Sequence, residues 1–179
     1  DMCRALCLNE DLGETVALAH DLGHSPFGHT GEDALTDCLN QRGLPSVNRH
    51  LHAAKIVTVL ERRYAAYDGL NLCWETLEGI AKHNGPVHGD LAADMERLFE
   101  GFDLELHTHA SAEAQVAALS DDIAYNTHDV DDGLRAGMLD FADLAHVALP
   151  ARALKDIDAT FPGLPADKRA FEVARRMKI

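Results

Sequence analysis

The sequence of 179 residues is short of basic side chains, and it has no long apolar run. Its 16 Lys and Arg stand against 30 Asp and Glu, for a formal net charge of −14. This balance argues against general nucleic-acid binding, since phosphate contacts need clustered Lys and Arg. It also disfavours anionic small substrates, unless a metal ion or a local basic patch intervenes. No apolar run approaches the roughly 18 residues of a membrane span, so a membrane partner is not expected.

The four cysteines form no recognisable pattern. Cys3 and Cys7 are four residues apart, while Cys38 and Cys73 stand alone. Without a C-x-x-C pair, neither a zinc ribbon nor a thioredoxin-like site is expected. No signal peptide is evident either, so we expect reduced thiols in a cytoplasmic protein.

Strand patterns are also missing, because alternation of β-branched residues never exceeds four positions. An apolar fraction of 46% nevertheless predicts a real hydrophobic core. The fold class expected is therefore all-α, as one catalytic core over residues 1–179. The chain starts and stops within helical patterns that lack caps, which predicts a fragment of a longer protein that is incomplete at both ends. The predicted helices are 1–8, 10–22, 30–42, 49–64, 72–83, 111–135, 140–149 and 166–178.

Histidine is abundant, with 11 residues, and three of them lie in one short string. The string runs from His20 to Asp33 and reads HDLGHSPFGHTGED. Imidazole and carboxylate together suit Mn²⁺, Fe²⁺, Ni²⁺ or Zn²⁺, and also Mg²⁺ if water completes the coordination. His29 and Glu32 are spaced i,i+3 at the start of a helix, so they can hydrogen-bond as an acid–base pair.

The predicted helix from Ser111 carries a second group of polar residues. Asp121, Tyr125 and Asp129 share one face because they are spaced i, i+4, i+8. One interpretation is a solvated face, since residues 90–132 hold 12 acidic side chains and one Arg. The other is a metal site, because the apolar residues upstream predict that Asp121 is buried and needs a partner. The expected core face of this helix comprises Val116, Leu119, Ile123, Val130 and Leu134.

The remaining candidates are interpreted as ordinary structural residues. We expect His83 to cap a helix C-terminus as an imidazolium, which favours the helix dipole. Trp74 and Phe27 are expected in the core, although Phe27 lies inside the motif. His50, His52 and His128 have no assigned role.

Three strings in order, LAHDLGHSPFGHTGEDAL, GLNLCWETLEGIAKHNGP and AQVAALSDDIAYNTHDVDDGLRAG, resemble one enzyme family. They are similar to the deoxynucleoside triphosphate triphosphohydrolases of the HD superfamily, most of all the bacterial dGTPase-like branch. The resemblance implies an all-helical metallohydrolase that converts a dNTP to the deoxynucleoside and inorganic triphosphate. It further implies one divalent ion, with Mn²⁺ or Mg²⁺ favoured, and a homo-oligomer.

The resemblance also implies roles for individual residues. His20, Asp21 and Asp121 match metal ligands, and Asp122 matches a neighbour that misses the metal. His24 matches a histidine that contacts the phosphates and takes part in catalysis, while His29 and Glu32 match the catalytic pair. Tyr125 and Asp129 match contacts to the deoxyribose.

Two departures from the family pattern leave alternatives open. The fourth metal ligand of the family, a His, is expected upstream of this chain, since no His precedes His20. At a position where the family has an active-site His, this sequence has Arg49, followed by His50. The alternatives are therefore another HD-superfamily nucleotidase or phosphodiesterase, or a nucleotide-binding regulatory protein without turnover.

Overall fold

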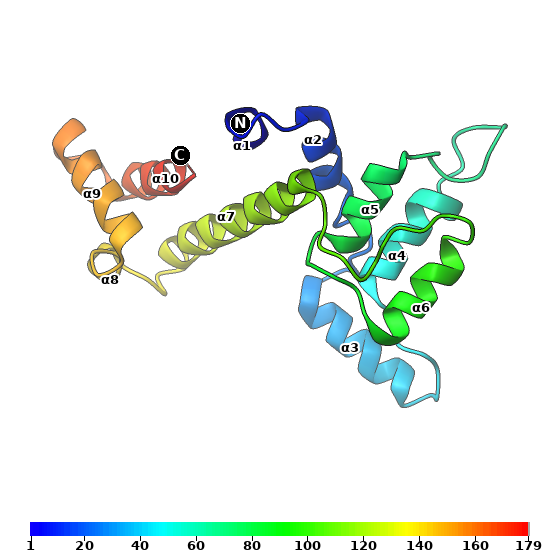
Figure 1. Ribbon diagram of the computed structural model, residues 1–179. Coiled ribbons are helices and arrows are strands. Elements are labelled where there is room, and N and C mark those ends of the chain that lie inside the picture. Colours follow the sequence, from blue (N-terminus) through cyan, green and yellow to red (C-terminus); the bar gives the residue numbers. More distant parts are fainter. Residues whose placement is uncertain (179) are drawn as a thin grey trace. The chain divides into compact units, whose positions relative to one another are not determined.

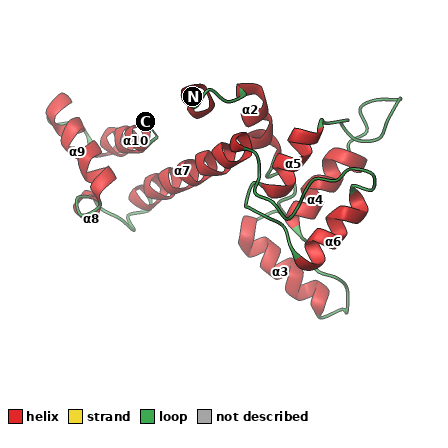
Figure 2. Ribbon diagram, in the orientation of Figure 1, coloured by secondary structure: helices red, strands yellow, loops and turns green. Residues whose placement is uncertain are grey.

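A computed structural model describes residues 1–178 of the chain, and it is built from helices and loops (Figures 1 and 2). Within these residues there is no β-strand, and one isolated bridge joins Arg62 to Gly69. The predicted all-α class is therefore confirmed. No helix among the described residues is long and apolar enough to cross a membrane.

The chain divides into two compact units, Asp1–Ala118 and Leu119–Ile179, which we describe separately. The first unit contains α1 (Met2–Ala5), α2 (Glu10–Ala19), α3 (Gly28–Asn40), α4 (Arg49–Lys55), a π-helical turn at Ile56–Leu60, α5 (Trp74–Lys82) and α6 (Gly89–Leu98). The long helix α7 (Ala112–Arg135) begins in this unit. Helix α5 packs against α2 and α4, and α4 also packs against α6 (Figure 1).

Two groups of buried side chains stabilise the first unit. The larger group joins α4, α5, α6 and the loop after α6, with Ala53, Val57, Ile80, Met95 and Leu104 among the most buried. The smaller group holds α2 to the start of α7 through Val16, Ala114 and Ala117. Gly79 of α5 allows α5 to approach α2 closely, since a Cβ there would lie 2.6 Å from Cγ2 of Val16. The packing of α2 fixes the residues that directly follow it.

The second unit contains the rest of α7, α8 (Phe141–Leu144), α9 (Ala148–Thr160) and α10 (Ala166–Met177). Helices α9 and α10 pack against each other. Leu144, Leu154, Ile157 and Val173 form the core, which Val130 and Leu134 of α7 extend.

Most predicted helices are present, but three predictions need correction. The predicted helix 140–149 is replaced by the short helix α8 and by α9, most of which lies beyond the predicted range. Pro150 lies in the first turn of α9, where its missing N–H has no cost. Helix α6 was not predicted, although Asp90 in its first turn favours a helix N-terminus. The predicted helix 49–64 is α-helical only as far as Lys55. A π-helical turn follows it and ends at Leu60.

The predicted core face of α7 is only partly correct. Val130 and Leu134 pack into the core of the second unit, but Leu119 is exposed. The fully buried positions are Ala114, Ala117 and Thr127. Small residues are buried at the start of α7 because α2 approaches closely there, which leaves no space for larger side chains.

Candidate metal and acid–base site

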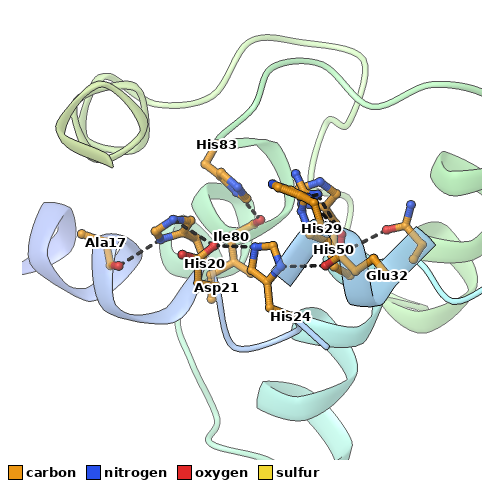
Figure 3. Close-up of polar contacts among 11 residues, drawn as sticks. Ala17, His20, Asp21, His24, His29, Glu32, His50, Ile80 and His83 are labelled. Carbon is orange, nitrogen blue, oxygen red and sulfur yellow. Dashed lines mark hydrogen bonds and ion pairs between the residues drawn. The ribbon is translucent and has the colours of Figure 1, made fainter. Parts of the chain in front are cut away.

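His20 ends α2, and hydrogen bonding determines which of its ring nitrogens is available. Its Nδ1 lies 2.9 Å from the carbonyl oxygen of Ala17 (Figure 3). A carbonyl oxygen only accepts, so Nδ1 carries the proton and donates it. The other nitrogen, Nε2, then presents a lone pair, which is the state that a metal-binding histidine requires. The His20 side chain is only 9% exposed, so this orientation is well defined.

Asp21 places a carboxylate oxygen between two imidazole rings. Its Oδ1 lies 3.2 Å from Nε2 of His20 and 3.2 Å from Nε2 of His24 (Figure 3). The Nδ1 of His24 lies 2.6 Å from Oε1 of Glu32 and donates to it, so in the neutral ring Nε2 is again a lone pair. Three electron-rich atoms therefore converge, an arrangement that only a proton or a cation stabilises. The mixed nitrogen and oxygen donors fit a divalent transition metal or Mg²⁺.

Glu32 connects His24 to the predicted acid–base pair. Its second oxygen, Oε2, lies 3.2 Å from Nδ1 of His29, so the structure does bring the predicted pair together. Burial opposes the ionisation of Glu32, but hydrogen bonds from His29, Arg49 and His24 outweigh it and lower the pKa of Glu32. Glu32 is therefore a carboxylate at neutral pH, able to accept from all three partners.

Arg49 contacts the same pair from the start of α4. Its Nη1 lies 3.2 Å from Oε2 of Glu32 and 3.2 Å from Nδ1 of His29. Asn48 caps α4 by accepting from the N–H groups of His50 and Leu51, which defines where Arg49 starts the helix. Gly23 allows α4 to approach the loop, since a Cβ there would lie 1.9 Å from the carbonyl oxygen of Arg49. The residue that departs from the family pattern thus lies at the centre of the site.

Two histidines that the motif did not include complete the cluster. His83 is buried, with its ring centroid 4.9 Å from that of His20 and 5.2 Å from that of His50. Burial lowers the pKa of His83, and burial together with the charges of His83 and Arg49 lowers the pKa of His50 to about 4. Both rings are therefore neutral at neutral pH. The string KHNGP is part of the family resemblance, but the position of His83 far from the motif in the sequence does not predict that it joins the site.

The prediction for His83 was half correct. It does end α5, with Nδ1 donating to the carbonyl oxygen of Ile80 at 2.9 Å. The predicted imidazolium is wrong, because burial disfavours the charged ring more than the helix C-terminus favours it.

Phe27 is not a core residue, contrary to prediction. It is 91% exposed, with φ of 70° at the N-cap of α3. The backbone of this turn packs tightly against the first turn of α3, since a Cβ at Gly31 would lie 1.9 Å from the Pro26 carbonyl oxygen. Trp74 does pack against the core as expected, and its Nε1 donates to the carbonyl oxygen of Asp103 at 2.7 Å.

The three remaining predicted residues lie on α7 in the second unit. Asp121, Tyr125 and Asp129 follow one face of the helix, and all three are exposed. The expected burial of Asp121 is wrong, because its side chain is exposed. The proposed roles of these residues stay predictions.

Comparison with known proteins identifies the family. The HD domain matches residues 1–126, which include the whole cluster in the first unit. A deoxyguanosinetriphosphate triphosphohydrolase-like protein of Paracoccus denitrificans is 58% identical over 97% of this chain. Proteins of the same description from Bradyrhizobium sp. and Bartonella quintana are 51% and 50% identical over 98% of it. The chain spans about 45% of the length of each of these relatives. It belongs to the HD domain family, and within that family it is similar to the dGTPase-like proteins.

Proposed function

We propose that the protein is a metal-dependent hydrolase that converts deoxynucleoside triphosphates to deoxynucleosides and inorganic triphosphate. The observation that carries this proposal is the convergence of His20 Nε2, Asp21 Oδ1 and His24 Nε2 beside the His29–Glu32 pair. An HD hydrolase needs a metal-binding pair and a neighbouring acid–base group, and both lie within the first unit. The names of the relatives support the choice of a deoxynucleotide substrate.

We propose that His20, Asp21 and Asp121 hold one Mn²⁺ or Mg²⁺, with a fourth ligand from a His upstream in the longer protein. The lone pair on His20 Nε2 and the carboxylate of Asp21 support this assignment. Asp121 follows Ala117 by four residues on the continuous helix α7, and Ala117 packs with Val16 of α2. A bound divalent ion would polarise the α-phosphate and activate water.

The other residues then have separate tasks. We assign contact with the phosphates to His24, which lies 2.6 Å from Glu32 through Nδ1. Its Nε2 donates to a phosphate oxygen when the ring carries both protons. His29 would transfer the proton, because it is hydrogen-bonded to Glu32 and its side chain is 67% exposed, so substrate can reach the ring. Tyr125 and Asp129 would contact the deoxyribose, since their spacing places them on the helix face of Asp121.

The test is a product assay on the full-length protein. The enzyme would be incubated with Mn²⁺ and each of the four dNTPs, and free triphosphate, pyrophosphate and orthophosphate would be separated by ion-exchange chromatography. Triphosphate together with the deoxynucleoside is expected. Release of pyrophosphate or orthophosphate as the first product would contradict the proposal and favour another HD phosphohydrolase.

One observation favours a second candidate, a nucleotide-binding protein without turnover. Arg49 occupies hydrogen-bonding positions on both His29 and Glu32. Calorimetry with dNTPs in the same divalent ions separates the two candidates, since the second one predicts binding with no product. Cytoplasmic location and homo-oligomer formation remain predictions.

A further inference from the structure

The side chain of Arg49 is held at one nitrogen. Nη1 contacts both Glu32 Oε2 and His29 Nδ1 at 3.2 Å. The backbone of Arg49 is held as well, because its carbonyl group packs against Gly23, two residues after Asp21. The guanidinium contact with Glu32 and the packing of the carbonyl group on Gly23 therefore together fix Arg49 relative to the His20–Asp21 pair.

The rest of the guanidinium is available for a ligand. Among residues 1–178, Arg49 makes hydrogen bonds through Nη1, and no partner contacts its Nε or Nη2. The side chain is 30% exposed. The edge formed by Nε and Nη2 carries parallel N–H groups, whose spacing matches two oxygens of a phosphate.

Arg49 is also the fixed positive charge of this cluster. The rings around it, His24, His29 and His50, are imidazoles, which carry no permanent charge. Asp21 and Glu32 contribute carboxylates, and the whole chain carries a net charge of −14. A phosphate that enters this cluster needs positive charge, and Arg49 supplies it in a form that does not titrate near neutral pH.

We infer that Arg49 is a phosphate-binding residue: Glu32 anchors its Nη1, and its Nε and Nη2 donate to phosphate oxygens of the substrate. This inference rests on the proposed function in taking a phosphate ester as the substrate. Arg49 adds to the contact of His24 and acts on the side of the site formed by α4. Its pairing with Glu32 orients the guanidinium and leaves the bidentate edge free.

The experiment measures binding of inorganic triphosphate to the full-length protein by calorimetry, with Mn²⁺ present. Arg49→Gln should weaken binding about 10- to 100-fold, the effect of losing charged hydrogen bonds. Arg49→Lys should fall between the wild type and Arg49→Gln, because Lys keeps the charge but lacks the bidentate edge. Arg63→Gln, which breaks an exposed pair with Glu61, is the matched control and should bind as the wild type does. Unchanged binding in both Arg49 variants would overturn the inference.

A double-mutant cycle with Glu32→Gln separates direct binding from simple neutralisation of Glu32. If Arg49 contacts phosphate, Arg49→Gln still weakens binding in the Glu32→Gln background. If Arg49 only neutralises Glu32, its effect disappears in that background, and the inference is wrong. Circular dichroism of each variant checks that the fold is kept. If Arg49→Gln does not fold, Arg49→Lys is the variant to compare with the wild type, because it keeps the ion pair with Glu32.

The two proposals can fail separately. Arg49-dependent binding of triphosphate, without triphosphate release from any dNTP, would overturn the proposed function and leave the phosphate site standing. Triphosphate release with normal binding in Arg49→Gln would overturn the phosphate site alone.

Discussion

In two histidines of the site, a neighbouring oxygen determines which ring nitrogen carries the proton. Ala17 holds the proton of His20 on Nδ1, and Glu32 holds that of His24 on Nδ1, so both rings direct Nε2 at Asp21. Rings in these tautomers bind a cation without first losing a proton, as long as they are neutral. The carbonyl group of Ala17 therefore prepares His20, the ring assigned to the metal, before any ion arrives.

Asp121 and Asp122 provide a matched pair for testing the third ligand. Asp121→Ala should lower the Mn²⁺ content of the full-length protein, because one charged oxygen ligand is lost. Asp122→Ala removes the same charge from the adjacent position and should leave the metal content close to that of the wild type. Elemental analysis after dialysis measures both. Equal metal content in the two variants would show that the ligand assignment is wrong.

His50 should make the protein sensitive to acid. Its pKa is lowered from 6.5 to about 4, so between these values the unfolded chain binds a proton that the native state does not. The stability that neutral His50 allows is complete above pH 6.5 and is lost as the pH falls towards 4. His50→Gln, which does not titrate, should therefore lose less stability between pH 7 and pH 4.5. Urea unfolding at both pH values measures this.

Exposed His146 is the control for that measurement. His146→Gln removes an imidazole without touching the cluster, and its pH dependence should match that of the wild type. A His50→Gln variant with the same pH dependence as His146→Gln would contradict the role given to His50.

Among the elements, the contact between α4 and the loop after α2 depends on Gly23. A Cβ at this position would lie 1.9 Å from the Arg49 carbonyl oxygen and 2.6 Å from the Ala53 nitrogen, so backbone must move. Gly23→Ala should destabilise the protein by about 1–3 kcal/mol and also reduce activity, because Arg49 and Asp21 separate.

Gly43→Ala is a useful comparison for Gly23→Ala. Gly43 has φ of 66° with no atom within 4 Å of a Cβ, so the substitution adds backbone strain of about 1 kcal/mol without a clash. Its activity should be unchanged, since Gly43 lies outside the cluster. Chemical denaturation and the product assay together test both variants. Equal activities would show that the α4 contact does not position the site.

A buried ion pair holds α5 to the loop that leads into α7. Nζ of Lys82 lies 2.9 Å from Oε1 of Glu78, with side-chain exposures of 1% and 3%. Glu78 also accepts from the N–H of Ser111, and Lys82 donates to Thr108 and to the carbonyl oxygen of Glu105. Every charge is therefore satisfied, and the start of α7 is fixed.

Lys82→Ala should cost about 3–5 kcal/mol of unfolding free energy, because it leaves the Glu78 carboxylate buried and unpaired. The double variant Glu78→Gln, Lys82→Met should be less destabilised than Lys82→Ala, since no isolated charge remains. Arg63→Ala, at an exposed pair, should change stability little. Urea unfolding compares the three variants. A Lys82→Ala variant as stable as Arg63→Ala would contradict this account.

Across the whole molecule, the net charge of −14 opposes binding of a polyanion. If the proposed function holds, a divalent ion and Arg49 provide local positive charge at the site, although the net charge of the chain is negative. Removal of divalent ions with EDTA should therefore abolish triphosphate release and weaken dNTP binding, and added Mn²⁺ should restore both. Calorimetry and the product assay measure the effects. Activity that survives exhaustive chelation would contradict a metal-dependent mechanism.

The sequence by itself determined the helical class, the position of most helices and the residues of the densest part of the site. These features depend on local spacing, caps and breakers, as with Asn9 before α2 and Asn84-Gly85-Pro86 after α5. The His29–Glu32 pair was predictable for the same reason, because i,i+3 spacing on one helix brings the two side chains together.

Only the tertiary structure decided which distant residues join the cluster and in what charge state. Arg49 and His50 reach it because α4 approaches the loop after α2 closely at Gly23, and His83 reaches it because α5 packs against α2 and α4. No local pattern encodes these contacts. Burial keeps the two histidines uncharged, which is why His83 is neutral at a helix C-terminus where its sequence position predicted an imidazolium. Spacing along a chain predicts neighbours within one element, whereas desolvation and contacts between elements depend on the assembled core.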